Sequence, residues 1–222
     1  MGGDNLSYLT RKLQKVINDL ANWGSRCGLT FSPEKTVAII FTRKKIKEVN
    51  KLKIYGKVIE YQTSTKYLGL TLDSKLNWTQ HINNVLTSNL AYLRRLINKT
   101  KSVHGPKPKL IKWAYTGIIR PRVSYGVMIW GNKLHLKKHD AMLTQLNRTA
   151  IKGLTKFKQS TPTAALEIIT DIIPLKLHLL KTGMTTYCRL KSQLDRWKGK
   201  TNSHKILSHL EFWEKKRLKK KS

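Results

Sequence analysis

The chain has 222 residues, which is enough for one compact domain or two small ones. Its 44 Lys and Arg outnumber 12 Asp and Glu, and the net charge of +32 indicates a polyanionic partner, either a phosphate backbone or an acidic membrane surface. The hydrophobic fraction of 40% argues against disorder, no apolar run is long enough to span a membrane, and the first residues lack the pattern of a signal peptide.

Apolar residues at spacings of three and four predict one amphipathic helix from Asn5 to Cys27. Gly28 is expected to end this helix, because glycine readily adopts the left-handed conformation of a helix stop. Ser32 to Lys35 then has the composition of a turn containing proline. The short apolar run Val37 to Phe41, next in the chain, predicts a strand.

The next part of the chain has the pattern of a hairpin and a further strand. Lys53 to Tyr61 predicts two short strands around a turn at Gly56 and Lys57. The run from Tyr67 to Leu72 predicts a third, buried strand whose backbone lies close to another group at its glycine. Asp73 is expected to be a turn residue that caps the start of the next element.

From Trp78 onward the sequence has helical patterns only. Helices are expected from Trp78 to about Lys101, from Leu110 to Ile119, from Leu136 to Leu154, from Thr163 to Ile169 and from Pro174 onward. Pro121 should end or kink the second of these helices, and Val123 to Trp130 is either its continuation or a buried turn. Trp113 and Tyr115 are expected in the core rather than as base-stacking platforms.

This order of elements predicts an α+β protein. A helix, a strand, a hairpin and another strand suit a small antiparallel sheet with a packed helix on one face, and an all-helical bundle should follow.

The positive charge is concentrated in the middle of the chain. Between Ser74 and His139 there is no Asp or Glu, whereas thirteen Lys and Arg occur, and this acid-free stretch predicts an unbroken cationic face. A phosphate backbone is the expected partner of such a face, and no membrane contact is expected. The candidate nucleic-acid-binding residues are Lys75, Arg94, Arg95, Lys99, Lys101, Lys107, Lys109, Lys112, Arg120 and Arg122.

Neither the cysteines nor the histidines predict a metal site. Cys27 and Cys188 lie far apart, no C-x-x-C occurs, and both are expected to be free thiols. His135 and His139 have a helical spacing that permits zinc binding, but no third ligand accompanies them. We therefore expect no metal ion and no cofactor in this chain.

Three blocks of sequence, in a fixed order, resemble one known family. The blocks are G-L-T-F-S-P-E-K-T with V-A-I-I-F, then T-S-T-K-Y-L-G-L-T-L-D-S-K-L-N-W, then L-N-R-T-A-I-K-G-L-T-K with T-P-T-A-A-L-E-I-I-T-D-I-I-P-L. Together they resemble the back half of the reverse transcriptase of non-LTR retrotransposons, most closely the jockey-like LINE elements. The resemblance extends over most of the chain, from about Leu6 to Leu194.

The resemblance implies a domain division and roles for particular residues. It makes residues 1–77 a palm remnant, 78–159 a helical thumb that tracks the template–primer duplex, 160–197 a helical extension and 198–222 a basic, partly disordered tail. Lys35 would approach the phosphates of the incoming nucleotide and act as a proton donor, although a plain turn lysine is the alternative. Ser32 departs from the Asn of many members. The implied primer-grip hairpin comprises Tyr67, Leu68, Gly69 and Leu70.

The family polymerises DNA on an RNA template with two metal ions, Mg²⁺ in the full-length enzyme, held by aspartates. The resemblance places those aspartates upstream of the helix that begins near Asn5, and no two acids in the first 75 residues are adjacent. We therefore expect a truncated reverse transcriptase that binds RNA, DNA or their hybrid but does not polymerise alone. The alternatives are one half of a complemented polymerase, paired with the missing half, and a repurposed basic RNA-binding protein. Each is compatible with a ribonucleoprotein in the nucleus or the cytoplasm.

Overall fold

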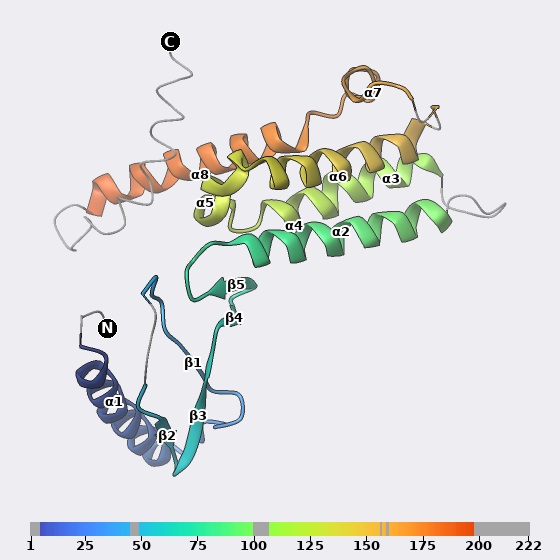
Figure 1. Cartoon of the computed structure of the whole chain (residues 1–222). Helices are drawn as coiled ribbons and strands as arrows, with labels where there is room; N and C mark the ends of the chain where they lie inside the picture. Colours follow the sequence, from blue (N-terminus) through green and yellow to red (C-terminus); the bar gives the residue numbers. More distant parts are fainter. Residues whose placement is uncertain (1–4, 45–48, 100–106, 156, 159, 198–222) are drawn as a thin grey trace. The chain divides into compact units, whose positions relative to one another are not determined.

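The computed structural model describes residues 5–44, 49–99, 107–155, 157–158 and 160–197 (Figure 1). The chain divides into two compact units, Met1–Trp78 and Thr79–Ser222. The first unit combines a helix with short strands and the second is helical, so the predicted α+β class is confirmed.

The first unit opens with helix α1, Leu6–Arg26. The side-chain oxygen of Asn5 accepts a hydrogen bond of 3.1 Å from the backbone N–H of Tyr8, which caps the helix start. The chain leaves the helix through Gly28, whose φ of +70° is the left-handed conformation expected of a stop residue. The predicted helix and its end are therefore confirmed.

A three-stranded sheet packs against α1. It contains β1 (Val37–Ile39), β2 (Leu52–Ile54) and β3 (Lys57–Gln62) in the order β1-β3-β2. Strands β2 and β3 form the predicted antiparallel hairpin, but its turn is at Tyr55 and Gly56, one residue earlier than expected. Strand β1 pairs with β3 in parallel. Ala21 of α1 meets Leu52, Ile54 and Ile59 in the small core of this unit.

Strands β4 (Ser64–Tyr67) and β5 (Leu70–Asp73) form a separate two-stranded hairpin. Leu68 and Gly69 make its two-residue turn, with φ of +46° and +83°. The single buried strand expected from Tyr67 to Leu72 is therefore wrong, because the chain reverses at the glycine and Tyr67 is exposed. The sheet takes β1, not this segment, as its third strand.

The second unit consists of helices. They are α2 (Thr79–Lys99), α3 (Pro108–Ala114), the π-helical turn η1 (Tyr115–Ile119), α4 (Arg120–Ser124), α5 (Val127–Trp130), the 3₁₀ turn η2 (Gly131–His135), α6 (Lys137–Thr155), α7 (Thr163–Thr170) and α8 (Leu175–Trp197). Helix α6 packs on α2, α3, α7 and α8, and α8 also packs on α4 and α5 (Figure 1). The core of this unit therefore lies around α6, where Leu143 and Leu146 are buried.

Helix α3 does not stop at Pro121 but continues through η1 into α4. Proline lacks an N–H, and its ring crowds the carbonyl four residues earlier in an α-helix. The chain meets this constraint with a wide turn, in which the N–H of Arg120 bonds to the carbonyl of Tyr115. The segment Val123 to Trp130 was expected to be either a helix continuation or a buried turn, and it contains both a helical part and a turn. Helix α4 ends at Ser124, and a turn at Gly126 leads into α5.

No helix in the described part of the chain combines the length and the apolar character that crossing a bilayer requires.

The close packing of α6 against α2 and α3 gives a test of the second unit. A Cβ at Gly153 would lie 2.7 Å from Cγ1 and Cδ1 of Ile97 and 3.4 Å from Cδ1 of Ile111. We expect Gly153→Val to lower the free energy of unfolding by about 1–3 kcal/mol, measured by urea denaturation of the full chain, because the site is overpacked.

The reverse is expected where a helical glycine is not crowded. A Cβ at Gly117 would have its nearest neighbour, Nε1 of Trp113, at 3.9 Å, so Gly117→Ala should raise the free energy of unfolding by about 0.5–1 kcal/mol.

A double variant tests the crowding at Gly153. Adding Ile97→Ala to Gly153→Val should cost less stability than the sum of the two single changes, since it removes the crowding atoms. Strict additivity would contradict this description of the packing.

Candidate nucleic-acid interface

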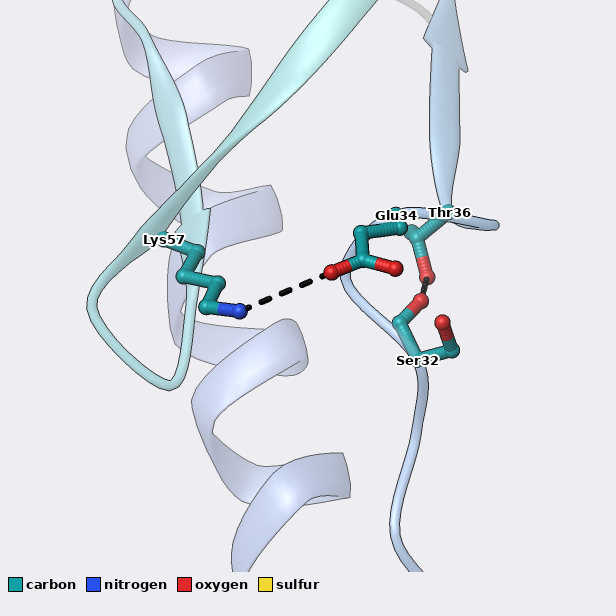
Figure 2. A network of polar contacts seen from close by, with 4 residues as sticks. All are labelled: Ser32, Glu34, Thr36 and Lys57. Atoms are coloured by element: carbon teal, nitrogen blue, oxygen red, sulfur yellow. Dashed lines mark hydrogen bonds and ion pairs between the residues drawn. The ribbon is translucent and has the colours of Figure 1, made fainter.

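Ser32, Glu34 and Thr36 belong to a tight turn immediately before β1 (Figure 2). Lys35 lies within this turn. The N–H of Thr36 donates to the carbonyl of Pro33 at 3.2 Å, and the Thr36 hydroxyl donates to the carbonyl of Ser32 at 2.7 Å. Glu34 reaches across to Lys57 at the start of β3, with 3.7 Å between Oε1 and Nζ. One backbone hydrogen bond and the Thr36 hydroxyl thus hold the turn, and the Lys35 side chain is exposed.

The β4–β5 hairpin presents an apolar tip, since Tyr67 is 62% and Leu68 is 72% exposed. The base of the hairpin lies beyond the carboxyl end of β1. There the N–H of Thr42, which follows β1, donates to the carbonyl of Ser74, which follows β5, at 2.9 Å. Lys35 precedes the amino end of β1, so this lysine and the base of the hairpin lie at opposite ends of that strand. A hairpin is present where the primer grip was expected, and its role stays a prediction.

Asp73 has the predicted role of a capping turn residue. Its Oδ1 accepts from the N–H groups of Lys75 at 3.0 Å and Asn77 at 3.1 Å, and its Oδ2 accepts from that of Trp78 at 2.9 Å. These bonds hold a turn in which Leu76 and Trp78 have positive φ, an unfavourable conformation for large side chains. The carboxylate therefore stabilises the chain just before α2.

Three of the predicted basic residues gather on one surface of the second unit. The Arg122 guanidinium of α4 lies 5.7 Å from the centre of the Tyr92 ring of α2, within cation–π range. Arg95 comes three residues after Tyr92 and Lys99 four residues after Arg95, and these helical spacings place them on the same side of α2. We name Tyr92, Arg95, Lys99 and Arg122 the α2–α4 basic surface.

The expected unbroken cationic face is not what the structure shows. Arg94 precedes Arg95 by one residue and so projects about 100° away around the helix. The Lys112 ammonium donates to the carbonyl of Thr170 at 2.9 Å, toward α7. Lys75 belongs to the first unit and Lys101 lies outside the described residues.

Arg120 was expected to contact phosphate, and this prediction is wrong because the side chain is only 7% exposed. Its guanidinium donates to the carbonyl of Ile173 and lies 5.0 Å from the centre of the Tyr115 ring. Burial, and then the nearby charges of Arg120 and Lys181, lower the pKa of His178. Arg120 therefore joins α4 to the segment before α8 and is unavailable at the surface.

A chain of buried hydrogen bonds continues from Tyr115. Its hydroxyl donates to Oδ1 of Asn147 at 2.6 Å, and Nδ2 of Asn147 donates to Oε1 of Glu167 at 2.6 Å. Burial raises the pKa of Tyr115 to about 12, so the phenol remains a hydrogen-bond donor at neutral pH. The expectation that Tyr115 lies in the core is confirmed.

Trp113 is the functional candidate that sequence reasoning missed. It was assigned to the core, but the structure leaves it 61% exposed on α3. The signal was present in its neighbours, because Lys109 and Gly117, four residues before and after it, are not core residues.

The described residues contain no group of three His, Cys, Asp or Glu side chains placed to hold a metal ion. His139 is buried, and its Nδ1 lies 3.0 Å from the carbonyl of Lys133.

The chain is similar in sequence to proteins of retrotransposons. The chain is 30% identical over 151 residues to a probable RNA-directed DNA polymerase from transposon BS of Drosophila melanogaster, covering 65% of this chain and 16% of that protein. A putative 115 kDa protein in the type-1 retrotransposable element R1DM of the same species is 22% identical over 175 residues, covering 79% of this chain and 17% of that protein.

A Pol polyprotein from a type-1 retrotransposable element R1 of Nasonia vitripennis is 22% identical over 184 residues, covering 81% of this chain and 55% of that protein. The chain is thus a homologue of non-LTR retrotransposon reverse transcriptases and polyproteins, as its sequence blocks predicted. It spans from about a sixth to about half of the length of these relatives. No family model and no solved structure matches.

The raised pKa of the buried Tyr115 phenol predicts a specific loss of stability at alkaline pH. The phenol titrates near pH 10 in the unfolded chain and at about 12 in the folded one, so its contribution is complete below pH 10 and is lost as pH rises toward 12. Between pH 9 and pH 11 the free energy of unfolding should fall by about 1 kcal/mol more in the wild type than in Tyr115→Phe.

Urea denaturation at each pH measures this difference. Tyr115→Phe should also be less stable than the wild type at pH 7 by about 1–3 kcal/mol, because Asn147 loses its donor. The control is Tyr92→Phe at an exposed site, which should keep the wild-type dependence on pH. Parallel pH profiles for Tyr115→Phe and the wild type would refute the buried hydrogen bond.

Proposed function

We propose that this chain is a nucleic-acid-binding part of a non-LTR reverse transcriptase, in which the helices after Trp78 act as the thumb and hold a template–primer by its phosphates. The observation that carries this proposal is the α2–α4 basic surface, which lies within the acid-free stretch. Arginine and lysine contacts to phosphate fix position without reading sequence, so RNA, DNA and their hybrid are all suitable partners.

The charge of the second unit supports this proposal. Between residues 79 and 197 there are 21 Lys and Arg but only four Asp and Glu. Of those four, Asp140 pairs with Lys176 at 3.0 Å and Glu167 accepts from Asn147, so neither neutralises the α2–α4 basic surface. A surface of this kind attracts phosphate, with an affinity that falls steeply as salt rises.

Catalysis in this family needs carboxylates that bind metal ions, and we propose no such carboxylate in this chain. Asp73 uses both carboxylate oxygens on backbone N–H groups, and no two acids of the sequence are adjacent. We therefore propose that Lys35 and the hairpin tip at Tyr67 to Leu70 assist an active site whose Mg²⁺-binding aspartates lie elsewhere in a family enzyme.

Removing charge from the α2–α4 basic surface tests the binding mode. The variant carrying Arg95→Gln, Lys99→Gln and Arg122→Gln should bind an RNA–DNA hybrid more weakly than the wild type. The slope of log K against log salt concentration should fall by about 1 for each phosphate that the variant no longer binds. Fluorescence anisotropy with a labelled oligonucleotide, over a series of salt concentrations, gives both quantities.

The control is a variant with the same loss of charge on α1 of the first unit, carrying Arg11→Gln, Lys12→Gln and Lys15→Gln, which are all exposed. It should lose less affinity if the site is local. An equal loss in both variants would show that only total charge matters and would overturn the assigned surface.

A second candidate function is to complete a polymerase whose catalytic half is another chain. Helix α1 favours it, because a side of the helix next to its packed face carries Leu13, Val16, Leu20 and Trp23, all more than a third exposed. Their spacing of three and four residues makes one apolar stripe along the helix. Such a stripe suits burial against a further domain.

Primer extension separates the two candidates. The full chain with Mg²⁺, primer–template and nucleotides should give no product above background. Adding a relative's fragment that carries the family aspartates should give synthesis only under the second candidate, and Leu20→Asp with Trp23→Asp should then abolish the gain. Synthesis by the chain alone would mean that it contains a catalytic centre, and would refute both candidates.

A further inference from the structure

Trp113 occupies an exposed side of the continuous helix made by α3, η1 and α4. The indole is 61% exposed, whereas Tyr115, two residues later, is fully buried. Leu110 and Gly117 lie three residues before and four residues after Trp113, so all three share one side of the helix and all three are exposed. The indole is therefore part of an accessible surface that extends along two helical turns.

The surroundings of Trp113 are positively charged. Lys109 lies one turn before it and Lys107 stands at the start of α3, and both are exposed. The stretch of sequence between Asp73 and Asp140 contains no acid. A large apolar ring beside these lysines suits a nucleic acid, since Lys can bind the backbone while the ring takes a base.

Gly117 has no internal role that explains it. Gly153 is required by packing, and Gly28 and Gly56 by their positive φ, but a Cβ at Gly117 would meet nothing closer than 3.9 Å. A helical glycine without such a reason lowers stability, and one use of glycine is to let another molecule approach the backbone closely. That open backbone lies beside the Trp113 ring, because Nε1 of Trp113 is the atom that the Cβ would meet.

The same segment forms the π-helical turn η1, Tyr115–Ile119. Turns of this kind are uncommon and are frequently found at functional sites, where they reposition side chains.

We infer that Trp113 is a base-stacking platform for an unpaired nucleotide of single-stranded RNA or DNA, and that Gly117 admits the sugar–phosphate next to it. This inference rests on the proposed nucleic-acid binding and names the part of the strand that the second unit recognises. Stacking tolerates every base, so the site adds affinity for unpaired strands without sequence preference.

Substitution of Trp113 in the full chain tests the stacking. Binding to a labelled oligouridylate 12-mer and to a blunt RNA duplex is measured by anisotropy at one salt concentration. Trp113→Ala should weaken binding of the single strand by about 5- to 150-fold, the range for loss of one base–aromatic stack. Duplex affinity and the salt dependence should stay at the wild-type values, because the variant keeps every phosphate-binding side chain.

Two further variants separate stacking from apolar contact. Trp113→Phe should keep most of the affinity for the single strand, whereas Trp113→Leu, which is apolar but has no ring, should behave as Trp113→Ala. The matched control is Tyr8→Ala on α1, where an aromatic side chain is also exposed. It should bind both oligonucleotides as the wild type does. Circular dichroism melting shows that each variant is folded.

Gly117→Ala tests the close approach independently, because it should stabilise the fold and yet weaken binding of the single strand several-fold. Unchanged affinity in Gly117→Ala would overturn the close approach at that residue. Equal binding by Trp113→Leu and the wild type, or equal losses on single strand and duplex, would overturn the stacking role. Wild-type chain that binds no nucleic acid would instead refute the proposed function.

Discussion

The rotation of the helix formed by α3, η1 and α4 decides what the second unit presents to a ligand. Two polar side chains help to fix this rotation, since Tyr115 donates to Asn147 and Arg120 donates to the carbonyl of Ile173. Turning the helix would leave these buried groups without partners, which costs far more than an exposed hydrogen bond is worth. The buried side chains of Ile111, Ile119 and Val123 favour the same rotation. Trp113 and Arg122 are held outside as a consequence.

The π-helical turn explains how Tyr115 and Arg120 can both face inward. Residues five apart in an α-helix differ by about 140° in direction, so a regular helix would point one of them toward solvent. The wider turn at Tyr115–Ile119 changes this phase, and the Arg120 guanidinium comes to lie 5.0 Å from the Tyr115 ring. The same shift brings Arg122 over Tyr92 and so builds part of the α2–α4 basic surface.

The proposed functions of the two units rest on different chemistry. In the first unit, the turn at Lys35 and the β4–β5 hairpin are exposed features held by backbone hydrogen bonds, and Asp73 serves the backbone as well. In the second unit, the features are positively charged side chains and the exposed indole of Trp113, outside a core in which Asn147 donates to Glu167. Homology to proteins of non-LTR retrotransposons covers most of the chain and so includes both sets of features.

The sequence by itself determined the α+β class, the ends of α1, the β2–β3 hairpin and the kinship to non-LTR elements. Each of these depends on local patterns: a capping Asn5, a left-handed Gly28, apolar spacing and ordered motif blocks. Only the tertiary structure decided that Arg120 is buried, that Trp113 is exposed and that β1 joins the sheet in parallel. These outcomes depend on contacts between residues distant in sequence and on a π-helical turn that interrupts the helical repeat, so no regular spacing along the chain encodes them.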